Sequence, residues 1–259
     1  MSELAVATIT DHFLAAASRA AARVAEAIAG RADAAPVGIG ADGAPTEDAD
    51  DAAERAALVE LLPLGMPIVS EEAGLVGAER VDPAEPWISL DPLDGSRNFV
   101  AGYPAYAVSI GLVQHGRTLA GVIVDLAVGT RWVGVAGGGA TRDGILIRTR
   151  RGALGAVPSP LAGATAIPVL KGVSRVRISG STASDLARVG DGSLSVFYGL
   201  DRPVVHVHDL AAAIVIVEEA GGCVVDRTGG RPVLVPDPAV TLDVVAACDR
   251  DFALALLRR

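Results

Sequence analysis

Hydrophobic residues along the middle of this chain follow a two-residue period, and that period changes near residue 150. Within residues 105–136, apolar side chains alternate with other residues, most regularly over 106–112, which is typical of strands with one buried face. Turn sequences at 114–116 and 128–129 separate the apolar stretches, so the region predicts an antiparallel meander. Beyond residue 150, short apolar runs alternate with helical patterns, which predicts helices that cover a sheet.

Helices and short strands are expected before the meander. Apolar residues spaced three and four apart predict a helix between Leu14 and Gly30. Acidic residues after Thr46, which we interpret as the N-cap, begin a second helix because the helix dipole favours carboxylates in the first turn. The apolar runs at 67–70 and 87–90 predict two short strands.

The segment 152–172 is rich in Pro, Gly and Ala and is a candidate linker. We therefore expect two domains in an α/β (α+β) fold. The first, at 1–150, is an α+β domain with the antiparallel sheet and most of the candidate metal ligands. The second, at 151–259, is an α/β domain.

The charge balance limits the partners of the chain. Thirty-one acidic residues against 22 basic ones give a net charge of −9, and without a basic block we expect no nucleic acid and no anionic membrane as partner. Lys171 is the only lysine, which excludes a P-loop lysine and Schiff-base chemistry elsewhere in the chain.

Cys223 and Cys248 lie apart in apolar stretches, as expected of reduced, buried thiols. Without a signal peptide or an apolar run of roughly 18 residues, we expect a cytoplasmic protein.

Acidic residues stand where predicted strands end or helices begin. Glu71-Glu72 follows one strand, Asp91-Pro92-Leu93-Asp94-Gly95-Ser96 follows the next, and Asp209 begins a helix. Pro92 restricts its own φ and the preceding residue, so Asp91 and Asp94 can converge. Gly95 allows the backbone to approach a ligand, and exposed amides at a helix start would bind an anion. Carboxylates beside a phosphate-sized anion site suit Mg²⁺.

Each of these acidic segments also has a purely structural explanation. Asp-Pro-x-Asp-Gly is an ordinary turn sequence, a Glu-Glu pair is commonly solvated, and a lone aspartate often caps a helix. We favour a metal site because three such segments occur together. His206 and His208 would share one face of a strand, and we interpret them as packing residues rather than as a zinc site.

Three motifs resemble those of a known family. Residues 87–99, with the run Asp91-Pro92-Leu93-Asp94-Gly95-Ser96, resemble the first signature of the inositol monophosphatase family. Residues 208–213, followed by 219–222, resemble its second signature, and Ser70-Glu71-Glu72 resembles its glutamate motif. The order and spacing agree, and the resemblance extends over residues 10–257. Within the family, residues 40–46 resemble the archaeal branch, whose members act on inositol monophosphates and on fructose 1,6-bisphosphate.

The resemblance implies a layered αβαβα sandwich of the sugar-phosphatase type, with a metal-dependent phosphatase site. It implies that Glu71, Asp91, Asp94, Asp209 and the carbonyl of Leu93 hold two or three Mg²⁺ ions. Asp50 and Ser96 would orient the attacking water. The substrate-binding residues implied by the motifs are Gly95, Ser96, Arg97, Arg177, Ser181, Asp201 and Arg202, although arginines such as Arg177 and Arg202 are equally compatible with surface salt bridges.

The expected substrates are small phosphorylated sugars or polyols, inositol 1-phosphate and fructose 1,6-bisphosphate among them. Two alternatives stay open: a phosphatase of the nucleotide 3′-phosphoadenosine 5′-phosphate, and a catalytically silent regulatory protein on the same fold. The family resemblance also suggests a homodimer. The chain departs from the family pattern at Ser96, where Thr is usual, at His208, where Trp is common, and at Ala213, where Gly is common. Ser96 keeps the hydroxyl and therefore its expected role, and the departures at His208 and Ala213 bear on specificity more than on the chemistry.

Overall fold

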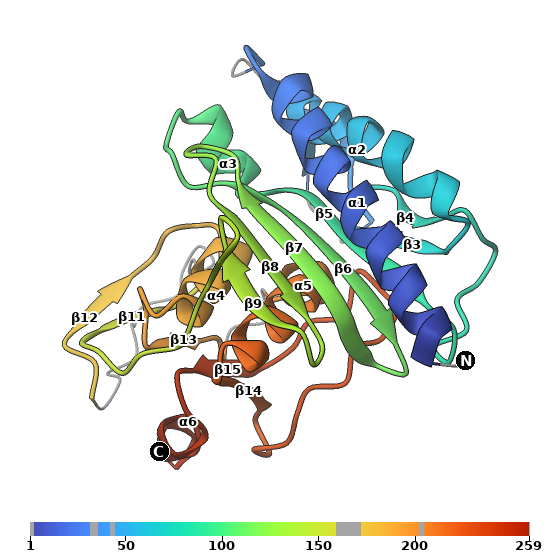
Figure 1. Ribbon diagram of the computed structural model, residues 1–259. Coiled ribbons are helices and arrows are strands. Elements are labelled where there is room, and N and C mark those ends of the chain that lie inside the picture. The colour runs from blue at the N-terminus through green and yellow to red at the C-terminus, as the bar shows by residue number, and fades with distance from the viewer. Residues whose placement is uncertain (1–2, 32–35, 42–44, 159–171, 202–204, 259) are drawn as a thin grey trace.

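The computed structural model describes residues 3–31, 36–41, 45–158, 172–201 and 205–258. Its helices and sheets are arranged in five alternating layers, from α1 and α2 to α6 (Figure 1). The layered α/β sandwich implied by the family resemblance is confirmed. None of the helices in these ranges is long and apolar enough to cross a membrane.

The larger sheet has eight strands in the order β10-β9-β8-β7-β6-β5-β3-β4. Strands β6 to β9 form the antiparallel meander predicted from the two-residue period. One pair, β3 and β5, is parallel. The strands are β3 (Ile68–Ser70), β4 (Gly74–Val76), β5 (Trp87–Asp94), β6 (Ala107–Gln114), β7 (Arg117–Asp125), β8 (Arg131–Val135), β9 (Gly139–Arg142) and β10 (Ile145–Leu146).

One face of this sheet is covered by α1 (Glu3–Ile28) and α2 (Asp48–Leu61), which pack on each other and on β5 to β7. Their apolar stripes bury Phe13, Val24 and Leu61 completely or nearly so against the sheet. The short helices η1 (Leu62–Leu64) and α3 (Ser96–Val100), and the two-stranded ribbon of β1 (Pro36–Ile39) and β2 (Pro45–Glu47), complete this half.

The opposite face is covered by α4 (Thr182–Gly190) and α5 (Val207–Glu219), which separate the large sheet from the small one. The small sheet has the order β12-β11-β13-β15-β14, and α6 (Arg250–Leu257) packs on β14 and β15 (Figure 1). Its strands are β11 (Leu154–Ala156), β12 (Arg175–Arg177), β13 (Val196–Tyr198), β14 (Cys223–Asp226) and β15 (Val244–Ala247).

Several local expectations need correction. The stretch 152–172 is not only a linker, because β11 lies in it and pairs with both β12 and β13; residues 159–171 lie outside the described ranges. The N-cap of α2 is Glu47 rather than Thr46. The second strand of the parallel pair continues through Asp91 to Asp94 instead of ending at residue 90. The division into domains at residue 150 stays a prediction.

A row of three glycines across neighbouring strands lets α5 lie directly on the sheet. Gly111 of β6 pairs with Gly121 of β7, and Gly121 pairs with Gly134 of β8. A Cβ atom added to Gly121 would lie 2.5 Å from the carbonyl oxygen of Ala212, and one at Gly111 or Gly134 would lie 2.8 Å from α5. Because these three positions have no side chains, the backbone of α5 can lie close to the sheet. This close approach fixes where the first turn of α5 lies.

Gly121→Ala is expected to destabilise the protein by about 1–3 kcal/mol, the usual cost of an inserted methyl group in a packed interior. The reason is that the methyl group meets helix backbone, which cannot rotate away. Chemical denaturation of Gly121→Ala measures the effect. Gly152→Ala, at a position with open space around the added Cβ, is the control. Equal stability of wild type and Gly121→Ala would contradict the close approach of α5.

Candidate active site

The parallel pairing of β3 and β5 places two of the predicted ligands side by side. Ser70 pairs with Leu90, and the backbone N–H of Glu71 donates to the carbonyl of Leu90 at 3.1 Å. The residues that follow, Glu71 and Asp91, therefore lie side by side. Asp91 is 1% exposed, whereas Glu71 is partly exposed.

An irregularity in β5 turns Asp91 and Asp94 toward each other. The pairing of β5 with β6 shifts register between these two residues, and the N–H of Leu93 donates to Asp91 Oδ1 at 3.0 Å. The predicted convergence of the two carboxylates is confirmed. It takes place within the strand rather than in a turn after it, because the backbone resumes its pairing with Ala107 at Asp94.

Asp94 is bound at the N-terminus of α4. Its Oδ2 accepts from Ser181 Oγ at 2.6 Å and from Ala183 N at 2.8 Å, and its Oδ1 accepts from Thr182 N at 3.1 Å. The carboxylate thus satisfies amides that the helix leaves open. It also joins the first half of the chain to the second.

Asp209 reaches the same place from the first turn of α5. It is the third residue of that helix, and its Oδ2 accepts from the N–H of His206 at 2.6 Å. Oxygen atoms of Asp91, Asp94 and Asp209 all lie within 4.8 Å of one another. All three carboxylates are buried. Two segments far apart in the sequence, β5 and the start of α5, therefore meet in one acidic cluster.

Without a counter-charge, ionising the buried carboxylates of this cluster raises the free energy of the folded state. Burial raises the pKa of Asp91 well above its usual value, and the charges of Glu71, Asp94 and Asp209 raise it further. Burial raises the pKa of Asp94 to about 6, although hydrogen bonds from Ser181, Ala183 and Thr182 oppose the shift. A divalent cation would remove the repulsion. Carboxylate oxygens are the donors that Mg²⁺ prefers, so the residues present fit that ion.

A cavity of 410 Å³ opens over the carboxylates. Gly95, the N-cap of α3, has a φ of +89°, and a Cβ there would lie 2.8 Å from the carbonyl oxygen of Ala105. The glycine is therefore required by the chain's own backbone as well as by any ligand. The cavity is lined by Glu71, Glu72, Asp91, Leu93, Asp94, Gly95, Ser96, Arg97, Asn98, Pro158, Gly180, Ser181, Thr182, Asp185, His206, His208 and Asp209.

The other site residues predicted from the sequence do not all line this cavity. Arg97 lines the cavity and its side chain is exposed. Asp50 is buried and accepts from Glu47 N at 2.8 Å, but it is not among the lining residues. Arg177 and Asp201 also lie outside the lining, and Asp201 is ion-paired with Arg227 at 2.7 Å. Arg202 lies outside the described residues.

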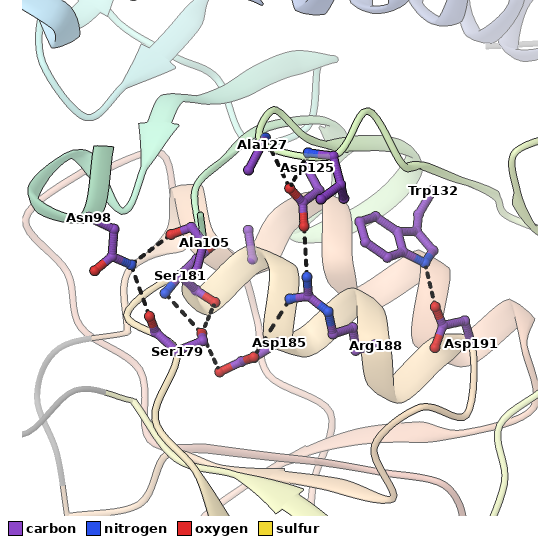
Figure 2. A network of polar contacts seen from close by, with 12 residues as sticks. Asn98, Ala105, Asp125, Ala127, Trp132, Ser179, Ser181, Asp185, Arg188 and Asp191 are labelled. Carbon is purple, nitrogen blue, oxygen red and sulfur yellow. Dashed lines mark hydrogen bonds and ion pairs between the residues drawn. The ribbon is translucent and has the colours of Figure 1, made fainter. Parts of the chain in front are cut away.

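Asp185 was not predicted from the sequence. Figure 2 shows its carboxylate between Ser179, whose Oγ donates at 2.8 Å, and Arg188, which also binds Asp125 at 2.7 Å. Burial raises the pKa of Asp185 to about 6. Asn98 extends the same network by donating to the carbonyls of Ala105 and Ser179. No motif signals Asp185, because it lies inside a helix and follows no strand.

The two histidines lie at a helix start and not on a strand. His206 is the N-cap of α5 and His208 is in its first turn, and their rings stack with centroids 5.0 Å apart. Burial, together with the neighbouring His206, lowers the pKa of His208 to about 3. The expectation of a shared strand face is wrong. The interpretation of the two histidines as packing residues rather than a zinc site stays a prediction.

Comparison with known proteins settles the family. The sequence profile of the inositol monophosphatase family matches residues 9–250, which is nearly the whole chain. The chain belongs to the inositol monophosphatase family. The phosphatase class predicted from the motifs is confirmed by the family and by the names of the relatives.

Relatives within the inositol monophosphatase family carry different names. The fructose-1,6-bisphosphatase/inositol-1-monophosphatase of Thermococcus kodakarensis is 35% identical over 200 residues, or 74% of each chain. The Nus factor SuhB of Pasteurella multocida is 32% identical over 200 residues, or 71% of this chain and 73% of the relative. The solved inositol monophosphatase of Anabaena (Nostoc) superposes with a TM-score of 0.76 at 26% identity, covering 95% of this chain and 94% of that one. The predicted likeness to archaeal dual enzymes is confirmed.

Proposed function

We propose that the protein is a Mg²⁺-dependent phosphomonoesterase that hydrolyses inositol 1-phosphate, fructose 1,6-bisphosphate or both. The observation that carries the proposal is the buried cluster of Asp91, Asp94 and Asp209 at the base of an open cavity. Burial, together with the charges of Glu71, Asp94 and Asp209, raises the pKa of Asp91, and a bound cation would offset both effects. A phosphate oxygen above them would complete the coordination that Mg²⁺ requires.

The proposed ligands are Glu71, Asp91, Asp94, Asp209 and the carbonyl of Leu93, for two or three Mg²⁺ ions. When bound, Mg²⁺ would hold the phosphate, lower the pKa of the attacking water and stabilise the leaving alkoxide in an in-line displacement. Ser96, at the first position of α3, lines the cavity. Its hydroxyl is the proposed orienting group for the water, and Asp50 is its proposed partner in that role. The exposed guanidinium of Arg97 is available to an anionic substrate.

The lining supports a polyol rather than a nucleotide. None of the described lining residues is Phe, Tyr or Trp, and adenine recognition relies on stacking surfaces of that kind. The lining instead offers carboxylates and hydroxyls, which hydrogen-bond to sugar or inositol hydroxyls. A cavity of 410 Å³ is of the size typical for small ligands. Arg177, Ser181, Asp201 and Arg202 stay proposed substrate residues, of which Ser181 is in the lining as the hydroxyl bound to Asp94.

A regulatory role is the second candidate, because one relative is named as a Nus factor. All four proposed carboxylate ligands are present in this chain, which supports catalysis. The proposed setting is the cytoplasm, and the proposed assembly is a homodimer.

Phosphate release from a panel of substrates tests the function. We expect the protein, stripped of metal and then given Mg²⁺, to hydrolyse inositol 1-phosphate and the 1-phosphate of fructose 1,6-bisphosphate faster than 3′-phosphoadenosine 5′-phosphate. Arg202→Ala should lower kcat/KM for the bisphosphate about 10- to 100-fold more than for inositol 1-phosphate, the usual effect of losing a charge-assisted hydrogen bond. Arg142→Ala, on a surface outside the cavity lining, is the control. No release from any substrate in Mg²⁺ would favour the regulatory alternative.

A further inference from the structure

His208 is a buried side chain in the cavity wall whose ring lacks the partners that a buried imidazole needs. It is 2% exposed, and its Nδ1 has no hydrogen-bond partner among the described residues. Its Nε2 faces Glu71 Oε2 at 3.9 Å, which is beyond hydrogen-bond distance. A neutral imidazole has one donor and one acceptor nitrogen, and leaving a buried nitrogen without a partner is costly.

Two carboxylates lie close to this imidazole. Ligand atoms of Glu71, Asp91 and His208 all lie within 4.8 Å of one another. An ionised carboxylate cannot donate a hydrogen bond to the nitrogen lone pair. A cation can satisfy the lone pair and both carboxylates at once. The arrangement therefore suits a positive centre held by one nitrogen and two oxygen donors.

This group is distinct from the all-carboxylate cluster, although the two share Asp91. Asp91, Asp94 and Asp209 offer only oxygen atoms, whereas Glu71, Asp91 and His208 add a nitrogen. His206 is a poorer candidate for the same ion. Its ring is nearly parallel to that of His208, with an angle of 16° between the planes and 5.0 Å between the centroids, and a metal lies in the plane of each imidazole that binds it.

We propose that Glu71, Asp91 and His208 form a mixed nitrogen and oxygen position for a first-row transition-metal ion, such as Mn²⁺, Co²⁺ or Zn²⁺. Imidazole suits these ions, while an all-oxygen position suits Mg²⁺. The inference deepens the proposed function, because it divides the metal centre into two positions of different chemistry. It rests on the nitrogen donor that His208 supplies in this chain.

The direct test is a spectrum of the wild-type protein. Metal-free protein is loaded with one equivalent of Mn²⁺, and electron spin echo envelope modulation is recorded to detect ¹⁴N next to the ion. We expect a ¹⁴N coupling in the wild type and its loss in His208→Gln. The coupling should persist in His206→Gln and in His12→Gln, a control at an exposed position of α1. No ¹⁴N coupling in the wild type would overturn the proposal without reference to any variant.

Metal titration gives the second readout. Loss of a group that only orients a ligating histidine costs about 10- to 100-fold in metal affinity, so loss of the ligand itself should weaken Co²⁺ binding by at least about 100-fold. Calorimetric titration of His208→Gln with Co²⁺ and with Mg²⁺ should show that loss for Co²⁺ and little change for Mg²⁺. Equal losses for both ions, or loss of the coupling in His206→Gln instead, would also overturn it.

The proposed function and this inference fail in different ways. Phosphate release by the wild type in Mg²⁺ alone tests the phosphatase, and it does not depend on a nitrogen ligand. A ¹⁴N coupling without phosphate release would retain the mixed position and reject the phosphatase. Phosphate release without the coupling would retain the phosphatase and reject the mixed position.

Discussion

Asp91→Asn is expected to lower kcat by about 1,000-fold and, at the same time, to raise the melting temperature of the metal-free protein. The loss of turnover follows because a cation supplies several kcal/mol of transition-state stabilisation, and about 4 kcal/mol corresponds to about 1,000-fold. The gain in stability follows because Asp91 is the buried centre of the repulsion among Glu71, Asp94 and Asp209. An asparagine can keep the hydrogen bond from Leu93 N and donate to a neighbouring carboxylate.

Burial of the carboxylates and, at Asp91, this repulsion set the pH dependence of the metal-free protein. The pKa of Asp94 is raised from 3.8 to about 6, and that of Asp91 is raised well above 3.8. The folded state therefore holds more protons than the unfolded state once the pH exceeds about 4, and its free energy of unfolding falls as the pH rises toward 6 and beyond. Mg²⁺ should restore the lost stability, because it binds the ionised carboxylates of the folded state.

Differential scanning calorimetry from pH 4 to pH 8, with EDTA and with Mg²⁺, measures these effects. For a chain of this size, a gain of about 1 kcal/mol corresponds to about 2–4 °C in Tm. Asp11→Asn, at an exposed position of α1, is the control. Asp94→Asn should gain less than Asp91→Asn, because its new amide would face the donors Ser181 Oγ, Thr182 N and Ala183 N. A metal-free Asp91→Asn protein less stable than wild type at pH 8 would contradict the repulsion.

The sequence could predict the acidic cluster because local pattern and topology act together there. Glu71 and Asp91 each follow an apolar run, and parallel pairing of the two runs brings the residues to one edge. Asp209 was placed at a helix start, and the helix begins two residues before it. These predictions depend only on short segments whose burial and turn chemistry are visible in the sequence.

Other parts of the site depend on contacts between distant segments and were not predictable. Asp185 gains its burial from Ser179, Arg188 and the meander residue Asp125, none of which forms a local pattern with it. β11 looked like a linker because Pro, Gly and Ala surround it, yet pairing on both sides makes it a strand. In both cases the structure is determined by tertiary contacts and not by the local sequence propensity.

Ser96→Ala is expected to lower kcat by about 100-fold or more with a smaller effect on KM, since proton-handling groups contribute about 10²- to 10⁴-fold and act mainly in the transition state. Ser96 lines the cavity at the start of α3, where a methyl group can neither donate to nor accept from a water molecule. Ser96→Thr should retain activity because it keeps the hydroxyl. Steady-state kinetics on inositol 1-phosphate with saturating Mg²⁺ measures both variants, and Ser193→Ala, in an exposed turn, is the control.

The prediction also includes a functional coupling between Ser96 and Asp50, which a double variant can test. Asp50 is 2% exposed, is held by Glu47 N and is not part of the cavity lining. We propose that its carboxylate takes part through a group that lines the cavity, the Ser96 hydroxyl. Asp50→Asn should accordingly lower kcat, and the double variant Asp50→Asn/Ser96→Ala should lose little more than the worse single variant, because residues that act as a unit are not additive. Multiplicative losses would make the two residues independent, and a fall in Tm that tracks the fall in kcat of Asp50→Asn would assign Asp50 to the capping of α2 alone.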